Sequence, residues 1–431
     1  MLPLVINFVH SHQSSLLNAL ESFLVSLLRT SFPGLSYEQL VDHLVEKLHS
    51  FSSSSARDSI NSVAKCVAAL SLLDQKIAYN QAENLLKIIS KTSPKTPELH
   101  SYYALATFGF IGRKLDLTDF ENEIKETMNN FANHAEIDIN LKEMTSHCLG
   151  RIAAGNLHKF LSFILFNIRS LAIDDSSDRR AEFIMLNALK MCLLCGLEET
   201  TPNRYLPYLS DTWTLLLKRG ECKDDGIRYV IADCLAKIVL MLPGEMLLEL
   251  VKNFNSENVE LRATVIQAFG CVISDYPKNQ SEVFNTAVRA FLSLFPDPDL
   301  NVLRLALNAF NSLAHNRPEV LHAFDLNQFM PLIYSETNIR QELIRSIEMG
   351  PFKHVVDDGY ALRKAAYDCM FTLLETLSEM LDIDQFILFV QKGLDDSYEI
   401  KLRVYLMLRK LCELFPDKVS KRKFFKFFFF F

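Results

Sequence analysis

Apolar residues recur at helical spacing through most of the chain, in segments that follow one plan. Each segment has a turn rich in Asp, Asn, Gly or Pro, then a basic residue, then an apolar helix, and a Pro-containing turn often closes it. The segments 258–277 and 300–318 are two copies of this unit. The copies are centred on the basic residues Lys142, Arg228, Arg262, Arg304, Arg363 and Arg403. This recurrence indicates a repeat protein.

The distance between copies identifies the kind of repeat. Arg228 and Arg262 are 34 residues apart, Arg262 and Arg304 are 42 apart, and Arg363 and Arg403 are 40 apart. These steps lie within or near the ~40–47-residue period of HEAT and armadillo arrays, in which each period holds two helices and their turns. A chain of 431 residues is also too long for one ordinary hydrophobic core. The sequence therefore predicts an all-α fold, a HEAT-repeat α-solenoid built as a superhelical stack of helix pairs.

The helix around Arg304 is apolar on two sides. One stripe consists of Leu303, Leu307, Phe310 and Ala314, and the other consists of Val302, Ala306, Ala309 and Leu313. A helix with two apolar sides must be covered by a neighbour on each side. This helix is therefore expected to be the inner helix of its repeat, sandwiched between two others.

The step from Arg304 to Arg363 is 59 residues, which is too long for one repeat and indicates an insertion. In the inserted segment, Leu343, Arg345 and Ile347 share one face if the chain is extended. A turn signal at 350–351 and the strand-forming pair at 355–356 follow. We predict a β-hairpin at about 340–358, with eight residues per strand and a tip roughly 25 Å from the solenoid. The alternatives are an irregular packed loop or a helix over 337–347.

A lone hairpin is marginally stable in water, so a hairpin carried on a helical scaffold is expected to be buried in a partner. Met349 and Phe352 are the expected apolar anchors at the tip, and Lys353 with the pair Asp357 and Asp358 would set orientation and association rate. The predicted partner-binding residues are Glu342, Leu343, Ile344, Arg345, Glu348, Met349, Gly350, Pro351, Phe352, Lys353, His354, Val356, Asp357 and Asp358.

Charge and cysteine usage narrow the partner and the compartment. The chain has 45 Lys plus Arg against 52 Asp plus Glu, a net charge of -7, whereas a nucleic-acid binder usually has a basic face. We therefore expect no nucleic-acid partner. The nine cysteines are scattered and follow no disulfide framework, and the apolar N-terminus lacks the features of a signal peptide. Reduced thiols, and hence the cytoplasm and nucleus, are the prediction.

The sequence offers little chemistry for catalysis. Cys192 and Cys195 form a CxxC pair, but they lie in an apolar helical run without a second pair at metal spacing, which favours buried thiols. His147 is expected to be a core or turn residue rather than a ligand. The glycines do not assemble a phosphate-binding loop. We predict no enzyme activity, no catalytic residue, no metal site and no cofactor.

Three regions follow from these patterns. Residues 1–333 are expected to form a HEAT array, 334–420 to form C-terminal HEAT repeats that carry the hairpin, and 421–431 to be a Phe-rich tail outside the folded repeats. The tail has only a handful of apolar residues, far fewer than the ~20 that a membrane anchor needs, so no membrane association is expected. Translation through a low-complexity nucleotide tract at a wrongly placed chain end is the favoured explanation of the tail, and weak membrane association is the alternative.

The chain resembles the C-terminal third of the Cand family, the cullin-associated, neddylation-dissociated HEAT proteins. Four blocks carry the likeness in family order, at 63–70, 155–157, 213–222 and 297–302. The most specific block is the insertion, at 334–359, which HEAT arrays in general do not have. The resemblance covers about residues 1–420. It implies that the chain lacks the family's N-terminal two thirds, either as a fragment or as a shortened paralogue.

The resemblance also implies a function. Family members wrap an unneddylated cullin-RING scaffold, and their C-terminal arch lies on the N-terminal domain of the cullin. Their hairpin occupies the adaptor site, so they compete with adaptors and exchange substrate-receptor modules. The implied role is a non-catalytic, cullin-binding assembly and exchange factor for SCF-type ubiquitin ligases. The alternatives are a HEAT scaffold for nuclear transport or phosphatases, and a transcription regulator that interacts with the TATA-binding protein.

Overall fold

The computed structural model describes residues 14–30, 36–46, 56–92, 98–133, 138–171, 179–199, 202–295, 297–349 and 352–421. The Phe-rich stretch after Lys421 lies outside this range, so the prediction for it stays a prediction. The described residues are helical except for short turns and one two-stranded sheet, which confirms the predicted solenoid with an inserted hairpin. Two compact units, Met1–Leu215 and Leu216–Phe431, are each described by themselves below.

The described residues of the first unit are mainly helical. Its helices are α2 (Ser14–Arg29), α3 (Tyr37–Glu46), α4 (Ala56–Ser71), α5 (Gln75–Ser90), α6 (Glu98–Gly112), α7 (Glu121–Asn133), α8 (Ile139–Gly155), α9 (Ser162–Ser170) and α10 (Arg179–Leu197). The boundary between the units falls inside α11 (Leu206–Arg219). The sequence places a domain boundary at 333/334 instead, and that division remains a prediction.

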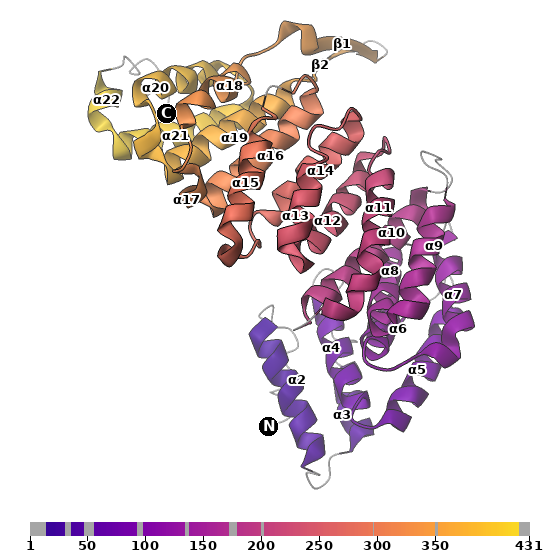
Figure 1. The fold of residues 1–431 in the computed structure, drawn as a ribbon. Coiled ribbons are helices and arrows are strands. Elements are labelled where there is room, and N and C mark those ends of the chain that lie inside the picture. The colour runs from indigo at the N-terminus through magenta and orange to yellow at the C-terminus, as the bar shows by residue number, and fades with distance from the viewer. Residues whose placement is uncertain are drawn as a thin grey trace. The chain divides into compact units, whose positions relative to one another are not determined.

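The second unit carries the hairpin between two of its helices (Figure 1). Its elements are α12 (Asp225–Met241), α13 (Pro243–Val251), α14 (Val259–Val272), α15 (Ser281–Leu292), α16 (Leu300–Asn316), α17 (Pro318–Leu321), α18 (Met330–Ser335), β1 (Ile344–Met349), β2 (Phe352–Asp357), α19 (Tyr360–Thr376), α20 (Ile383–Lys392), α21 (Tyr398–Leu414) and α22 (Pro416–Ser420). The helices α12, α14, α16, α19 and α21 pack in that order.

The polar turns of the repeats start the inner helices. Asp224, Asn258 and Asp299 stand directly before α12, α14 and α16, and each accepts a hydrogen bond from a free backbone N–H of the first turn. Asp299, for example, accepts from the N–H groups of Asn301 and Val302 at 3.0 and 2.9 Å. Such caps typically stabilise a helix by about 1 kcal/mol. The turn residues read from the sequence are therefore helix caps.

Helix α16 is buried on both sides, as its two stripes predict. All eight stripe residues are at most 6% exposed, and the helix packs against α14 on one side and α19 on the other. Burying a Leu or Phe side chain contributes roughly 1.5–3 kcal/mol. The core of this unit thus runs along the row of inner helices.

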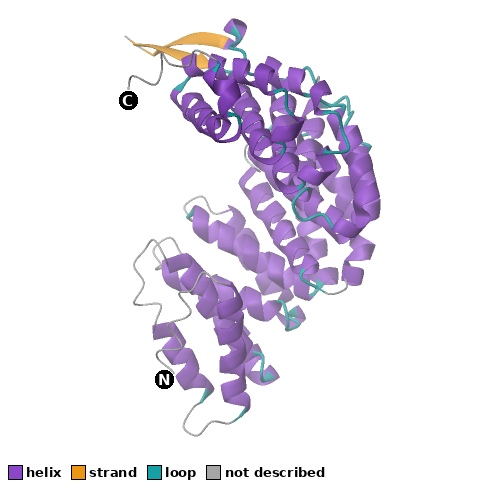
Figure 2. Ribbon diagram, turned by 90° about the vertical axis from the view of Figure 1, so that its left-hand side faces the viewer, coloured by secondary structure: helices purple, strands orange, loops and turns teal. Residues whose placement is uncertain are grey.

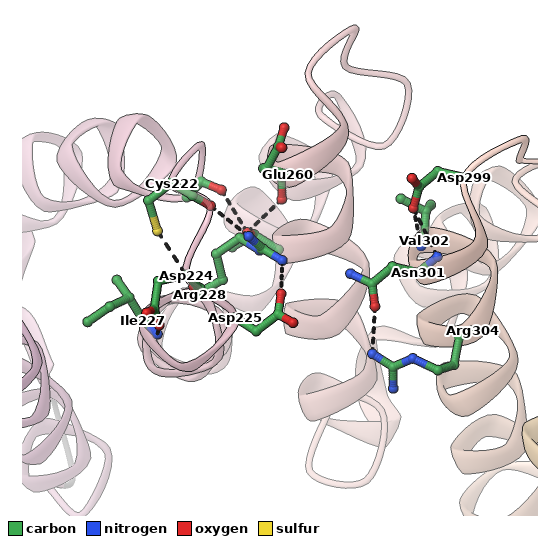
Figure 3. Close-up of polar contacts among 12 residues, drawn as sticks. Cys222, Asp224, Asp225, Ile227, Arg228, Glu260, Asp299, Asn301, Val302 and Arg304 are labelled. Atoms are coloured by element: carbon green, nitrogen blue, oxygen red, sulfur yellow. Dashed lines mark hydrogen bonds and ion pairs between the residues drawn. The ribbon is translucent and has the colours of Figure 1, made fainter. Parts of the chain in front are cut away.

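Two of the recurring arginines form hydrogen bonds at the start of their own helix. Arg228 donates to the Cys222 carbonyl at 2.7 Å and to the Asp225 carboxylate, and Arg304 donates to Asn301 at 2.6 Å (Figure 3). The Arg228 side chain is buried, so these bonds offset the cost of burying its charge. Arg228 thus reaches the turn before its helix, whereas Arg304 bonds within the first turn of its own helix.

Two other arginines connect consecutive repeats. Arg262 on α14 donates two hydrogen bonds to the carboxylate of Asp297, which lies in the turn before α16. The Arg262 Nε is 2.9 Å from Asp297 Oδ2. Arg403 on α21 instead reaches back to Asp368 in the middle of α19, with Nε 2.7 Å from Oδ1. The partner of Arg403 is therefore a residue of the neighbouring inner helix and not a residue of a turn.

Cys192 and Cys195 lie on α10 and are 0% and 3% exposed. Burial raises the pKa of both thiols, so they are held as neutral thiols. This agrees with the prediction of buried thiols. Within the described ranges, no three His, Cys, Asp or Glu residues are grouped to hold a metal ion, and no helix has the length and apolar character to cross a membrane.

Candidate partner-binding hairpin

The predicted hairpin is present, and it excludes the alternatives of a packed loop or a longer helix. Strands β1 and β2 pair antiparallel, in a register that runs from Ile344 opposite Asp357 to Met349 opposite Phe352. Each strand has six residues, not the eight expected, because the chain is still turning at 341–343. At about 3.3 Å per residue the strands are roughly 20 Å long. Figure 2 shows them, in orange, extending away from the helices of their unit.

Leu343 is not a strand residue, contrary to the expectation that it shares a face with Arg345 and Ile347. It ends a 3-10 turn, Gln341–Leu343, and its Cδ1 would lie 3.0 Å from a Cβ on Gly359. The small residue at 359 therefore lets Leu343 pack against the start of α19. Glu342, in the same turn, is exposed.

The first link at the root of the hairpin joins β1 to the residue that follows β2. Arg345 donates from Nε to Asp358 Oδ2 at 2.7 Å and from Nη2 to Oδ1 at 3.1 Å. This pair lowers the pKa of the Asp358 carboxyl and keeps it ionised. The backbone N–H of Asp358 also donates to the Leu343 carbonyl at 3.0 Å. Because both side chains of the pair are exposed, its own contribution to stability is small.

The second link joins the hairpin to the repeats. Asp357 Oδ2 lies 2.8 Å from Nη2 of Arg363, the arginine of helix α19. The same guanidinium donates to Asp396, in the turn before α21, at 2.9 and 3.0 Å. The side chains of Arg363 and Asp396 are each 5% exposed and that of Asp357 is 25% exposed, so the link is buried on the side of the repeats.

The described middle of the hairpin exposes apolar side chains. Val355 is 64% exposed and Ile347 is 39% exposed, while Ile344 and Val356 are half-buried. The register places Ile347 and Val355 on opposite faces of the hairpin, so each face offers an exposed apolar side chain to a partner. Neither Ile347 nor Val355 was among the predicted contact residues. Period-two alternation along β1 is the signal that could have found Ile347, and Val355 belongs to the strand-forming pair at 355–356 on β2.

The tip itself is outside the described residues. Gly350 and Pro351 are not described, and for Met349, Phe352, Lys353 and His354 only the backbone is described. Their roles as anchors and charged contacts remain predictions. Glu348 is on β1 and exposed. The structure assigns Asp357 and Asp358 to links within the protein, a role that the sequence did not reveal.

Known proteins match this chain over most of its length. The family TIP120, described as TATA-binding protein interacting (TIP20), matches residues 322–426, a range that contains the hairpin. Over 426 residues the chain is 34% identical to the Cullin-associated NEDD8-dissociated protein 1 of Drosophila melanogaster, and the match covers 95% of this chain and 33% of that protein. The chain belongs to the cullin-associated NEDD8-dissociated family.

Other members of the cullin-associated NEDD8-dissociated family give similar matches. The Cullin-associated NEDD8-dissociated protein 2 of Rattus norvegicus is 33% identical over 416 residues, covering 95% of this chain and 31% of that protein. A protein of Emericella nidulans named as the C-terminal part of protein 1 is 30% identical over 278 residues, covering 63% of this chain and 25% of its own length. The chain spans about a third of the length of the first two relatives, and the likeness corresponds to their C-terminal third.

Solved structures share the fold of this family member. The karyopherin Kap121p bound to the SUMO protease Ulp1p is 12% identical, with a TM-score of 0.50 and coverage of 97% of this chain and 42% of that one. A mutant Kap121p is 11% identical, with a TM-score of 0.51 and coverage of 97% and 46%. At such identities the likeness shows an α-solenoid and nothing about partners.

Proposed function

We propose that this chain is a non-catalytic assembly and exchange factor that binds unneddylated cullin in SCF-type cullin-RING ubiquitin ligases. Its hairpin enters the adaptor site on the N-terminal domain of the cullin, and binding therefore competes with the adaptor and its substrate receptor. The observation that carries the proposal is a projecting hairpin with exposed apolar residues, in a chain whose relatives are named cullin-associated.

The root of the hairpin supports a binding role. A two-stranded hairpin is marginally stable alone, yet this one is tied to its repeat by Asp357 and Arg363 and across its own strands by Arg345 and Asp358. Fixing a binding element in advance lowers the entropy lost on association. The exposed Val355 and its neighbours can then gain free energy from burial in a groove of the partner.

The remainder of the described fold serves as a scaffold. The inner helices bury their apolar sides against one another, and the buried thiols of α10 are held neutral. We place the activity in the cytoplasm and nucleus, where the free cysteines of this chain stay reduced. A function that depends on shape and surface fits these features and requires no reactive group.

A competition assay tests the proposal. Unmodified cullin N-terminal domain is immobilised with labelled adaptor, and the full chain is titrated in. A variant in which a short Gly-Ser turn replaces residues 344–356 removes Arg345 but keeps Leu343 and Asp357, and hence their contacts with Gly359 and Arg363. The intact chain should displace the adaptor, whereas the variant should not, although its helical circular dichroism and thermal melt stay nearly the same.

The matched control is Tyr229→Ala on α12, which removes a 54% exposed aromatic from the same unit and should compete like the intact chain. If the variant without the hairpin displaces adaptor as well as the intact chain does, the hairpin has no such role. Cullin binding without displacement by either protein would place the contact on the helices.

The family description favours a second candidate, because the matched range 322–426 is described as interacting with the TATA-binding protein. The same two proteins are passed over immobilised TATA-binding protein. Hairpin-dependent capture there, with no effect on the adaptor, would replace the cullin proposal.

A further inference from the structure

We propose that Asp357 and Arg363 form a rigid joint that sets the direction in which the hairpin leaves the solenoid, so that Asp357 is a positioning residue and not a contact to the partner. The inference rests on the proposed function for its effect on adaptor competition. The joint itself is a property of this chain and is measurable without any partner.

The geometry places one guanidinium between two carboxylates. Arg363 donates from Nε and Nη2 to Asp396 at 2.9 and 3.0 Å, and its Nη2 is also 2.8 Å from Asp357. Burial opposes the charge on Arg363, but the hydrogen bonds to Asp396 and Asp357 hold its pKa above the ordinary value. Removing one partner from such a buried group is costly, so the arrangement resists distortion.

Arg262 shows what an ordinary repeat does with the same arginine. Its Nε and Nη2 form the same fork with Asp297, at 2.9 and 3.3 Å, and its Nη1 donates to the Ser256 carbonyl of its own turn at 2.7 Å. At Arg363 the hairpin replaces that turn. The buried Nη1 of Arg363 has no hydrogen-bond partner, and the side chain of Asp357 on β2 binds the neighbouring Nη2. Arg363 thus binds a residue of a strand, whereas Arg262 binds a residue of a turn.

The joint lies at the base of the strands, so a small change of angle there moves the tip by a larger distance. Asp357 is the last residue of β2, so the strands extend roughly 20 Å beyond it. A change of about 10° at the root would move the tip by roughly 3 Å over that length. The exposed Arg345–Asp358 pair is screened by solvent and joins the strands only to each other, so it restrains this angle little.

Two adjacent carboxylates provide a matched test. Asp357→Asn weakens the link to Arg363 but keeps Arg363–Asp396, and its amide oxygen can still accept from the Gly359 N–H, as Asp357 does at 3.0 Å. Asp358→Asn weakens only the exposed pair. Arg262→Gln breaks the corresponding fork in a repeat without a hairpin and serves as the control for general loss of stability.

The first measurement is made on the chain alone. Spin labels are attached at Ser346→Cys on β1 and Asn308→Cys on α16, both exposed, in a background with Cys271→Ala and Cys412→Ser, and pulsed dipolar spectroscopy gives the distance distribution. Asp357→Asn should broaden it clearly. Asp358→Asn and Arg262→Gln should leave its width unchanged, although Arg262→Gln lowers the melting temperature.

The second measurement is adaptor displacement from cullin. Asp357→Asn should raise the concentration for half-displacement by about tenfold, because preorganisation is lost, and Asp358→Asn should change that concentration by less than about twofold.

An unchanged distance distribution in Asp357→Asn, or equal broadening in Asp358→Asn, would refute the joint. Broadening with undiminished competition would refute its positioning role. If the intact chain fails to displace adaptor while Asp357→Asn still broadens, the proposed function fails and the joint stands.

Discussion

The ring of Tyr334 lies flat on the ring of Phe389, with centroids 4.0 Å apart and planes inclined by 4°. Tyr334 belongs to α18, before the hairpin, and Phe389 belongs to α20, after it. Lys392 lies 4.4 Å from the Phe389 ring centroid. The stack therefore joins the helices on either side of the insertion, so that the repeat stays packed although its sequence is interrupted.

Removing this stack should loosen the repeat that carries the hairpin. Tyr334 is 2% exposed, so Tyr334→Ala leaves a large cavity and should lower the free energy of unfolding by about 3 kcal/mol. Tyr334→Phe keeps the ring and should cost less than about 1 kcal/mol. Urea unfolding followed by circular dichroism measures both. Equal effects of the two substitutions would show that the hydroxyl, and not the stacked ring, matters.

The two kinds of arginine contact should differ in strength. Arg262→Ala leaves the buried carboxylate of Asp297 without its partner, which should cost about 3 kcal/mol. Arg304→Ala loses a bond to Asn301 within one helix and should cost about 1 kcal/mol or less. Thermal and urea unfolding test this order, and cullin affinity per folded molecule should stay nearly unchanged in both. A selective loss of affinity would assign these arginines to the partner surface.

Gly155 should tolerate no side chain. A Cβ at this position would lie 2.0 Å from the Gly112 carbonyl oxygen, because α6 and α8 approach each other there through backbone. Gly155→Ala should therefore destabilise the first unit by about 1–3 kcal/mol. Gly270→Ala is the control, since its nearest contact is the Ala309 Cβ at 3.4 Å, and it should be neutral within about 1 kcal/mol. Comparable unfolding curves for the two variants would contradict the close approach.

His147 should make the first unit sensitive to acid. Burial, with Arg151 and Lys190 nearby, lowers its pKa from 6.5 to about 4 in the folded state. The unfolded chain therefore binds more protons, so the contribution of His147 is complete above pH 6.5 and is lost as the pH falls towards 4. The loss at pH 4 is up to about 3 kcal/mol.

His147→Gln cannot be protonated and should lose less stability across that pH range than the unsubstituted chain. The exposed His158 gives the control, and His158→Gln should follow the unsubstituted chain. Thermal unfolding midpoints of the three proteins, measured at a series of pH values, test this prediction. The same slope in all three proteins would show that His147 does not titrate with unfolding.

Local patterns predicted the fold because a repeat protein is built mainly from neighbouring contacts. The two stripes of α16 required two neighbours, and α14 and α19 supply them. The hairpin was predictable for the same reason, since turn and strand signals are local. Its boundaries were not, because the 3-10 turn that ends at Leu343 depends on packing against Gly359.

The sequence by itself determined the solenoid, the place of the insertion and the arginines that mark each repeat, because these depend on spacing along one chain. Only the tertiary structure decided that Asp357 binds Arg363 and that Asp358 binds Arg345, since adjacent carboxylates look alike until strand direction separates them. It likewise decided that Arg403 pairs with Asp368 and not with a turn. Those choices depend on which side chains face each other across repeats, and no periodicity within one helix contains that information.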